Sequence, residues 1–214
     1  MKAIKLCIFL VVAFSLASCG EDSAGIYRIN GSLVNGREAS NAYLYVFYPE
    51  YQKVRLEDST TVVDGAFMFE GRCDLPAEAY VGLDGEMRDV CSFILTGAVI
   101  DMKIGNNSYI VTGTADNDKL SALLTKQHTA VNERMRLQKE YQRLQADSVL
   151  TKAAEDSLLN SYRNQSVGLR ESVLAVLNDK KSSPLLSRMV FRMFSSFFPK
   201  SEADSLALLV EKMD

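Results

Sequence analysis

The sequence lacks the residues on which several common enzyme classes depend. It has no tryptophan and a single histidine, His128, which has no companions at the spacing of a metal site. It also contains no Gly-x-Ser-x-Gly motif, no phosphate-binding glycine loop and no Cys-x-x-Cys pair. We therefore predict a protein that is not an enzyme, with no catalytic residues, no metal, no cofactor and no small-molecule substrate.

The charge balance argues against nucleic acid as a partner. The chain has 24 basic and 27 acidic residues, a net charge of −3. This charge is uneven, at −8 from Cys19 to Asp116 and +3 from Asn117 to the last residue. The composition changes at the same place. We therefore predict two parts, a β-rich domain over residues 26–116 and a helical region over residues 117–214.

The first residues have the pattern of a secretory signal. Lys2 and Lys5 precede a short apolar run that ends in Leu16-Ala17-Ser18-Cys19. This ending resembles the lipobox of bacterial lipoproteins, in which the cysteine is lipidated and becomes the first mature residue. The resemblance implies a signal peptide over residues 1–18 and a membrane anchor on Cys19. The alternative is an ordinary signal peptide with an incidental cysteine.

Residues 19–25 are small and acidic and are typical of a flexible tether. Glu21 and Asp22 resemble a surface-export signal of Bacteroidota lipoproteins, although a solvated spacer would have the same composition. We therefore expect the protein to be attached to a bacterial membrane in the cell envelope. The outer membrane is the first candidate, and the protein would lie on its periplasmic or its surface face.

The region from Ile26 to Thr114 has the period of two that is typical of strands. Asp64-Gly65 lies between two such runs and predicts a hairpin with a type I′ turn. Gly31 lies on an apolar face and suggests a bulge. Residues 42–47 are apolar on both faces, which suits a strand buried on both sides. We predict an antiparallel β-sandwich or partly open barrel, because no segment supplies a crossover helix.

After Gly113 the apolar period becomes 3.6. Asp116 or Asn117 is the expected cap of a first long helix, and Asp147-Ser148 is the expected corner before a second one, over residues 151–177. Pro184 suits the first turn of a third helix, and residues 201–204 resemble a capping box before a fourth. The fold class is therefore α+β, with a long antiparallel helix pair after the β domain.

Several blocks of the β region resemble one family in order and spacing, the domain of unknown function 4369 of Bacteroidota lipoproteins. These blocks are residues 26–31, 43–45, 58–71 and 111–118. In many members a thioredoxin-like disulfide oxidoreductase domain follows. This chain has no Cys-x-x-Cys pair to carry that chemistry, so the resemblance implies the non-catalytic portion alone.

Cys73 and Cys91 are the cysteines that remain once Cys7 leaves with the signal and Cys19 takes a lipid. Exported thiols usually pair, and a bond between these two would stabilise the fold by roughly 3 kcal/mol in the chain-entropy model. Two buried thiols and a redox-responsive pair are the alternatives.

Several Asp-Ser steps resemble the O-glycosylation motif of Bacteroidota secreted proteins. Ser148, Ser157 and Ser205 are the candidate acceptors, although Asp and Ser also cluster at turns and caps. From these observations we predict a lipid-anchored envelope lipoprotein that acts as an interaction or scaffold module, with the membrane and an envelope protein as partners. The alternative is an accessory to a thioredoxin-like thiol–disulfide oxidoreductase system, or a truncated homologue of one.

Overall fold

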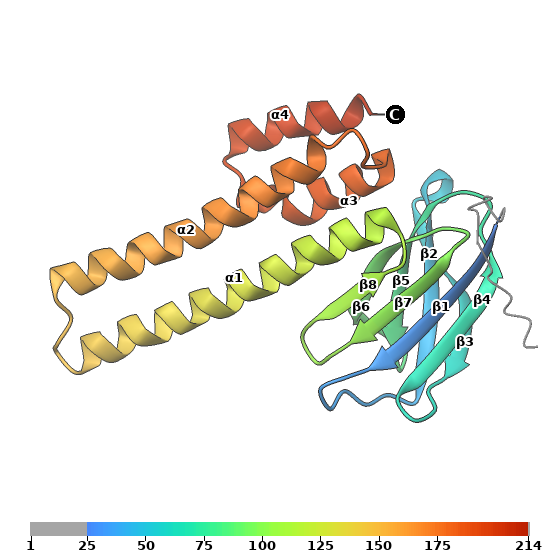
Figure 1. Cartoon of the computed structure of the whole chain (residues 1–214), viewed down its shortest axis with the longest axis horizontal. Helices are drawn as coiled ribbons and strands as arrows, with labels where there is room; N and C mark the ends of the chain where they lie inside the picture. Colours follow the sequence, from blue (N-terminus) through green and yellow to red (C-terminus); the bar gives the residue numbers. More distant parts are fainter. Residues whose placement is uncertain (1–24, 214) are drawn as a thin grey trace, which may run out of the picture.

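The computed structural model describes residues 25–213, with the backbone alone for residues 86–90 (Figure 1). The predicted signal peptide, the lipidation site Cys19 and nearly all of the predicted tether lie outside the described residues. Within them, eight strands precede four α-helices. The predicted α+β class is therefore confirmed.

The strands form two open sheets of four. Sheet A has the order β4-β1-β7-β8 and sheet B the order β3-β2-β5-β6. The strands are β1 (Ile26–Leu33), β2 (Asn41–Tyr48), β3 (Lys53–Thr61), β4 (Ala66–Arg72), β5 (Ala77–Leu83), β6 (Glu86–Leu95), β7 (Val99–Ile104) and β8 (Tyr109–Thr112). Every second side chain points between the sheets, so Ile29, Leu44 and Phe93 are fully buried there. This packing is the predicted sandwich.

One strand pair departs from the antiparallel expectation. β1 and β7 are parallel, with Ile29 opposite Ile100. A parallel pair needs a long connection, but the connection does not have to be a helix. Here the chain leaves sheet A after β1, builds β2 and β3, returns for β4, and adds β5 and β6 before β7. Sheet B therefore takes the place of the crossover helix.

Two glycines lie under aromatic rings in the β1–β4 pair. Gly31 is opposite Phe67, and a Cβ on Gly31 would come within 2.0 Å of that ring. Gly71 is opposite Tyr27, and a Cβ there would come within 2.4 Å of the Tyr27 hydroxyl. The expected bulge at Gly31 is wrong, since the register runs through it unbroken. The glycine instead makes room for a ring from the neighbouring strand.

Tight turns join the strands at one end of the sandwich. Asp64-Gly65 has φ of +51° and +73°, as the predicted type I′ turn requires, and Val63 and Ala66 form an isolated bridge around it. The predicted hairpin is wrong, because the strands before and after this turn, β3 and β4, belong to different sheets. Asn35-Gly36 and Asp84-Gly85 also have positive φ at both residues. The Asp84-Gly85 turn joins β5 directly to β6.

The helices are α1 (Ala115–Ala146), α2 (Lys152–Leu177), α3 (Pro184–Phe194) and α4 (Lys200–Glu211), with short 3₁₀ turns at Pro49–Tyr51 and Ser195–Phe197. Pro184 opens α3 as predicted. Two cap predictions are wrong. Thr114 caps α1 in place of Asp116 or Asn117, and α4 follows Pro199 without a side-chain cap. α1 and α2 form the predicted long antiparallel pair, which extends away from the sandwich as an arm (Figure 1).

α1 closes the gap between the two sheets at the edge where β6 and β8 lie. The Asn117 side chain accepts a hydrogen bond from the Ile94 N–H at 2.8 Å and donates one to the Ile94 carbonyl at 2.9 Å. One turn later, the Ser121 hydroxyl accepts from the Val111 N–H at 2.7 Å and donates to its carbonyl. Tyr109 pairs in the same way with both backbone groups of Ser92. These bonds satisfy strand groups that would otherwise be buried and unpaired.

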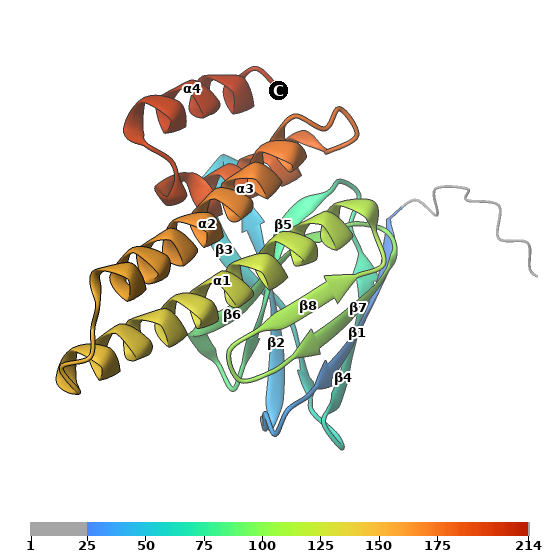
Figure 2. The same ribbon diagram turned by 60° about the vertical axis from the view of Figure 1, so that its left-hand side comes forward.

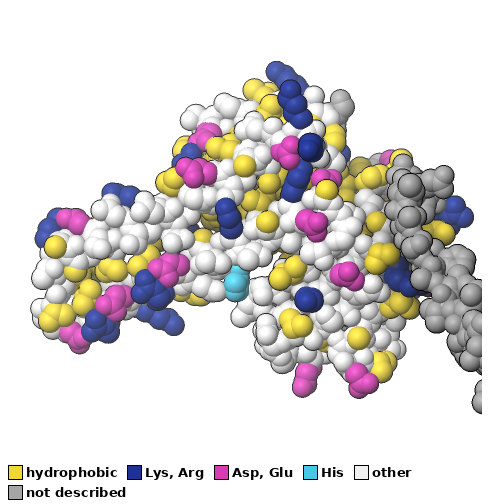
Figure 3. Space-filling model, in the orientation of Figure 1, with side chains coloured by type: hydrophobic (Ala, Val, Ile, Leu, Met, Phe, Trp, Pro, Cys, Tyr) yellow, Lys and Arg dark blue, Asp and Glu magenta, His cyan; other side chains and the backbone are white. Residues whose placement is uncertain are grey.

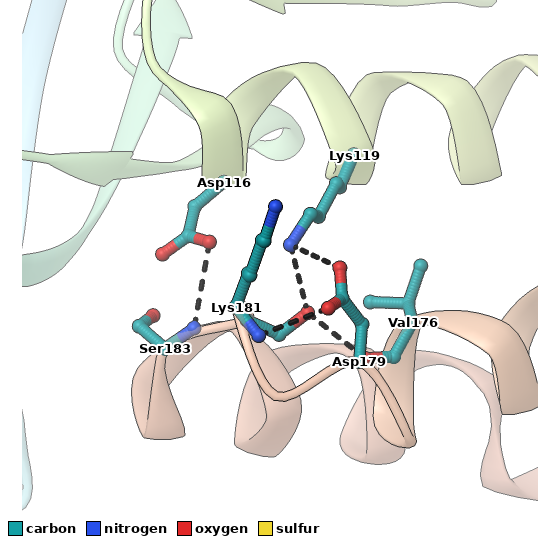
Figure 4. Close-up of polar contacts among 7 residues, drawn as sticks. Asp116, Lys119, Val176, Asp179, Lys181 and Ser183 are labelled. Atoms are coloured by element: carbon teal, nitrogen blue, oxygen red, sulfur yellow. Dashed lines mark hydrogen bonds and ion pairs between the residues drawn. The ribbon is translucent and has the colours of Figure 1, made fainter.

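The remaining helices pack on the base of the arm (Figure 2). Their core joins Ile94 of β6 to Leu120 of α1, Val173 of α2 and Phe194 of α3. The loop between α2 and α3 is also tied to the first turns of α1 (Figure 4). There Lys119 lies 2.8 Å from the Asp179 carboxylate and donates to the Ser182 hydroxyl at 3.1 Å.

We expect Asn117→Ala to lower the free energy of unfolding by about 2 to 4 kcal/mol, because the N–H and carbonyl of Ile94 would both lose their partner. Urea unfolding followed by circular dichroism measures the change. Asn160→Ala is the matched control, since Asn160 is exposed on α2, and its effect should stay within about 0.5 kcal/mol. Equal losses in the two variants would contradict this role of Asn117.

The hydroxyl of Tyr109 makes stability depend on alkaline pH. Burial raises the pKa of Tyr109 to about 12, against ~10 for an unfolded tyrosine. Its contribution is therefore complete below about pH 10 and is lost as the pH rises toward the folded value. Over this range we expect wild type to lose about 2 to 3 kcal/mol more stability than Tyr109→Phe. Urea titrations at a series of pH values check this, and parallel losses would refute it.

Candidate functional site

The outer face of sheet A is mixed, with charged and polar side chains between exposed apolar ones such as Met68 and Ile110. Arg28 of β1 forms an exposed ion pair with Glu70 of β4, and Asn30 donates to the Asp101 carboxylate at 2.9 Å. Acidic, basic and apolar side chains are mixed on the side of the sandwich that faces the viewer in Figure 3. Exposed ion pairs of this kind add little stability. Such a surface is typical of a sheet that faces water.

The outer face of sheet B differs, because aromatic and apolar side chains cover it. Tyr43, Tyr45 and Phe47 of β2 are half-buried and belong to neither core, while Leu56 of β3, opposite Tyr45, is 55% exposed. We call these four residues and Val54 the aromatic face. Residues 42–47 were expected to be buried on both sides, which is wrong for this face. Only Ala42, Leu44 and Val46, which point between the sheets, are buried.

A polar contact to α3 borders this face. Glu78 of β5 is buried and accepts hydrogen bonds from Tyr80 of the same strand and from Arg192 of α3. Burial, and then the bond to Glu78, raises the pKa of Tyr80, so its hydroxyl stays a donor. Glu78 also holds Arg192 as its counter-charge, which fixes α3 over β5. β2 and β3 lie beyond this contact, where the outer side chains of β3 are exposed and those of β2 are half-buried.

The two cysteines of the described chain lie in different places and are both thiols. Cys91 points into the sandwich core, close enough to Tyr109 to help raise its pKa. Cys73 follows β4, and its Sγ donates to the Leu75 carbonyl at 2.7 Å and lies 3.8 Å from the Leu95 carbonyl. Leu95 is four residues along β6 from Cys91, a span of roughly 13 Å in a strand. The structure therefore does not bring the two sulfur atoms together.

Cys73 lines a pocket of about 440 Å³ at one end of the sandwich. Tyr27, Tyr48 and Glu57 also line it, and the Tyr48 hydroxyl donates to Glu57 at 2.9 Å. Burial raises the pKa of Cys73, so little of the reactive thiolate exists at neutral pH. We call this the N-terminal end of the sandwich, because β1 begins here. It comprises residues 25–26, 48–54, 72–77 and 95–99.

No group of three or more metal-ligating side chains occurs among the described residues. His128 is half-buried on α1, where its Nε2 lies 2.9 Å from Asn132. Figure 3 shows it in cyan where the arm meets the sandwich. There it lines a crevice of about 370 Å³ with Tyr109 and Val131. This environment offers a lone imidazole rather than a catalytic or metal constellation.

The predicted glycan acceptors are all exposed. Ser148 lies at the corner between α1 and α2 with a φ of +55°, which confirms the predicted corner. Ser157 lies on α2, and Ser205 on α4 donates to the Ser201 carbonyl at 3.0 Å. Modification at these serines stays a prediction. No described helix is long and apolar enough to cross a membrane.

Comparison with known proteins gives one family and one solved structure. A crystal structure of a proposed cell adhesion protein from Bacteroides ovatus matches with 9% identity and a TM-score of 0.26. The match covers 42% of this chain and 43% of that one, less than half of its length, and at this level it bears on neither fold nor activity. No curated protein matches significantly.

The family match is to the family described as Domain of unknown function (DUF4369), over residues 27–120. It covers the eight strands and ends in the second turn of α1, just after Asn117. This match confirms the resemblance predicted from the strand and turn blocks.

Proposed function

We propose that the protein is a non-enzymatic lipoprotein of the cell envelope, anchored through Cys19, whose aromatic face binds a protein partner. The observation that carries the proposal is the contrast between the two outer faces. Sheet A presents ion pairs and polar side chains with single apolar ones such as Met68 between them, whereas on sheet B tyrosine, phenylalanine and leucine side chains lie side by side across β2 and β3. Aromatic residues are enriched at interface cores, where they bury large area at low entropic cost.

The arrangement of the helices indicates that the aromatic face is an interaction surface and not part of the hydrophobic core. Helices pack on the half of sheet B that contains β5 and β6, and the Glu78–Arg192 contact fixes where that cover stops. Tyr45 and Leu56 lie directly opposite each other on the accessible half. Contiguous apolar surface of this kind on a folded protein marks interaction sites. A matched protein surface would bury these side chains without rearrangement of the sandwich.

The proposed localisation follows from the lipobox pattern at Leu16–Cys19 and not from the described residues. The acyl chains on Cys19 would hold the protein at a bacterial membrane, with the outer membrane as the first candidate. A Cys19→Ser variant should lose acyl labelling and leave the membrane fraction. If the variant stays in that fraction, the anchor is elsewhere, and the aromatic face can still be tested by itself.

We expect Tyr45→Ser together with Leu56→Ser to abolish capture of the partner in a crosslinking pull-down from envelope membranes. The loss should be at least about tenfold, because truncation of central interface residues commonly costs about 2 kcal/mol or more. Met68→Ser is the control, since Met68 is half-exposed on sheet A, and it should capture the partner as wild type does. Thermal melting verifies that the variants are folded. Equal capture by all three chains would refute the role of the aromatic face.

The second candidate function is an accessory to thiol–disulfide exchange, and Cys73 in its pocket is the observation that favours it. A thiol enzyme could reach Cys73 through the pocket opening. The raised pKa of Cys73 opposes this role, because a protonated thiol is a poor nucleophile. The distance of Cys73 from Cys91 also opposes an intramolecular exchange without movement of β4 or β6.

Thiol labelling distinguishes a binding module with two unreactive thiols from an accessory to thiol–disulfide exchange. In the native, reduced protein we expect Cys73 to react with iodoacetamide more slowly than a free cysteine, and Cys91 only when the sandwich opens. Both should react at once after unfolding. Intact mass spectrometry counts the labels. A Cys73–Cys91 bond in protein purified under air would give a mass two hydrogens lower and no native labelling, and this outcome would favour the disulfide and the redox role.

A further inference from the structure

The two ends of the sandwich differ in chemistry. At the end opposite β1's start, the turns Asn35-Gly36, Asp64-Gly65 and Asp84-Gly85 are short and polar. At the N-terminal end the connections contain Pro49, Tyr51, Leu75 and Pro76. If both ends of the sandwich faced water alone, we would not expect apolar residues to be concentrated in the connections of one end.

Four large apolar side chains of the N-terminal end are exposed and come from four different segments. They are Leu75 (77% exposed), Ile26 (62%), Tyr51 (60%) and Val99 (55%). Leu75 has the highest exposure among the large hydrophobic residues of the described chain. Strand register places Ile26 opposite Arg72 at the end of β4 and close to Val99, since Arg28 is opposite Val99. Leu75 lines the pocket of this end together with Pro49 and Glu50, the residues before Tyr51. Single exposed hydrophobic residues are ordinary, but a group on the loops of one end is not.

We propose that this end of the sandwich docks on a lipid bilayer, with Tyr51 and Leu75 in the interfacial region. The inference rests on the proposed anchor at Cys19. Five residues, 20–24, lie between Cys19 and Gly25, and the six Cα–Cα steps from one to the other span at most about 20 Å. The Cys73 N–H donates to the Gly25 carbonyl, so the loop that carries Leu75 lies beside the start of β1 and a lipid on Cys19 keeps this end within reach of the bilayer surface.

The side chains suit the interface more than the hydrocarbon centre. The Arg55 guanidinium lies over the Tyr51 ring, 4.8 Å from its centroid, so this tip combines an aromatic ring with a charge. Tyrosine and arginine together are typical of the level of the lipid headgroups. Leu75 adds an aliphatic tip on the neighbouring loop. A modest apolar contact of this kind would orient a protein that a lipid already holds in place.

The charges of this end are balanced, which defines the mode of binding. Lys53 and Arg72 are offset by Glu50 and Asp74, and Arg55 just beyond this end is offset by Glu57. The contact therefore depends on apolar insertion, and anionic lipid should add little to it. A basic surface that reads anionic headgroups would behave in the opposite way.

The absence of tryptophan permits a direct test. Tyr51→Trp in the full chain, processed in a bacterial host and reconstituted into vesicles, gives a single tryptophan at the docking tip. We expect brominated phosphatidylcholine to quench its emission several-fold relative to unbrominated lipid. Val63→Trp is the control, since Val63 is 64% exposed next to the polar turn of the opposite end, and its emission should not change.

Three further readings decide the outcome. Leu75→Ser in the Tyr51→Trp chain should reduce the quenching several-fold, and added phosphatidylglycerol should leave it unchanged. Equal quenching at residues 51 and 63, no quenching at 51, or quenching that appears only with anionic lipid would each overturn the docking mode. Flotation of the vesicles reports the anchor separately. A protein that does not float disproves anchoring, whereas one that floats without quenching at residue 51 disproves docking.

Discussion

The structure depends on the way α1 satisfies the backbone of two edge strands. β6 and β8 end sheets B and A on the same side, and their free N–H and carbonyl groups would be buried there without partners. Asn117 and Ser121 provide these partners from consecutive turns of one helix. A side-chain amide and a hydroxyl can each donate and accept, so each replaces the missing neighbour strand at one residue. Both sheets are thereby fixed to a single rigid element.

This closure joins the helical region to the β domain. The turn of α1 that pairs with the strands also contains Leu120, which belongs to the helical core, and Ile94 enters that core from the β6 side. The family match also ends at residue 120, within this turn. On the opposite side of the sandwich the Asp64-Gly65 turn joins β3, the edge strand of sheet B, covalently to β4, the edge strand of sheet A. The edge of the sandwich formed by β3 and β4 is thus closed by a turn of the chain, and the edge formed by β6 and β8 is closed by a helix.

The arm is built differently at its base and its tip. At the base, α1, α2, α3 and α4 share a packed core, whereas toward the tip the inner face has isolated buried residues such as Ala130 and Leu137. Pairs within one helix, Glu133–Arg136 and Glu140–Arg143, support the outer turns. Exposed ion pairs of this kind add little to stability. Stability is therefore concentrated where α1 meets the sheets, and the outer half of the arm is free to serve other contacts.

The sequence predicts what depends on neighbouring residues. The Asp64-Gly65 turn, the Pro184 helix start and the long helix pair follow from backbone preference and short-range period. Asn117 shows the limit, because an asparagine near a helix start is a normal cap, and only the position of Ile94, 23 residues earlier in the chain, gives its amide another partner. Gly31 is similar, since the ring that excludes its Cβ belongs to Phe67 on another strand.

The aromatic face could not be predicted for the same reason. In residues 42–47 the side chains on both faces of the strand are apolar. This pattern indicates that both faces of β2 avoid water, but it does not say which element covers each face. The answer depends on where α3 packs, and α3 is held by Arg192 on Glu78, a contact between residues 114 positions apart. The hydrophobic pattern of a strand can be read from its own sequence, but which element packs on each of its faces depends on the tertiary fold. A strand that is apolar on both faces is therefore a candidate interface whenever the chain's own helices do not reach it.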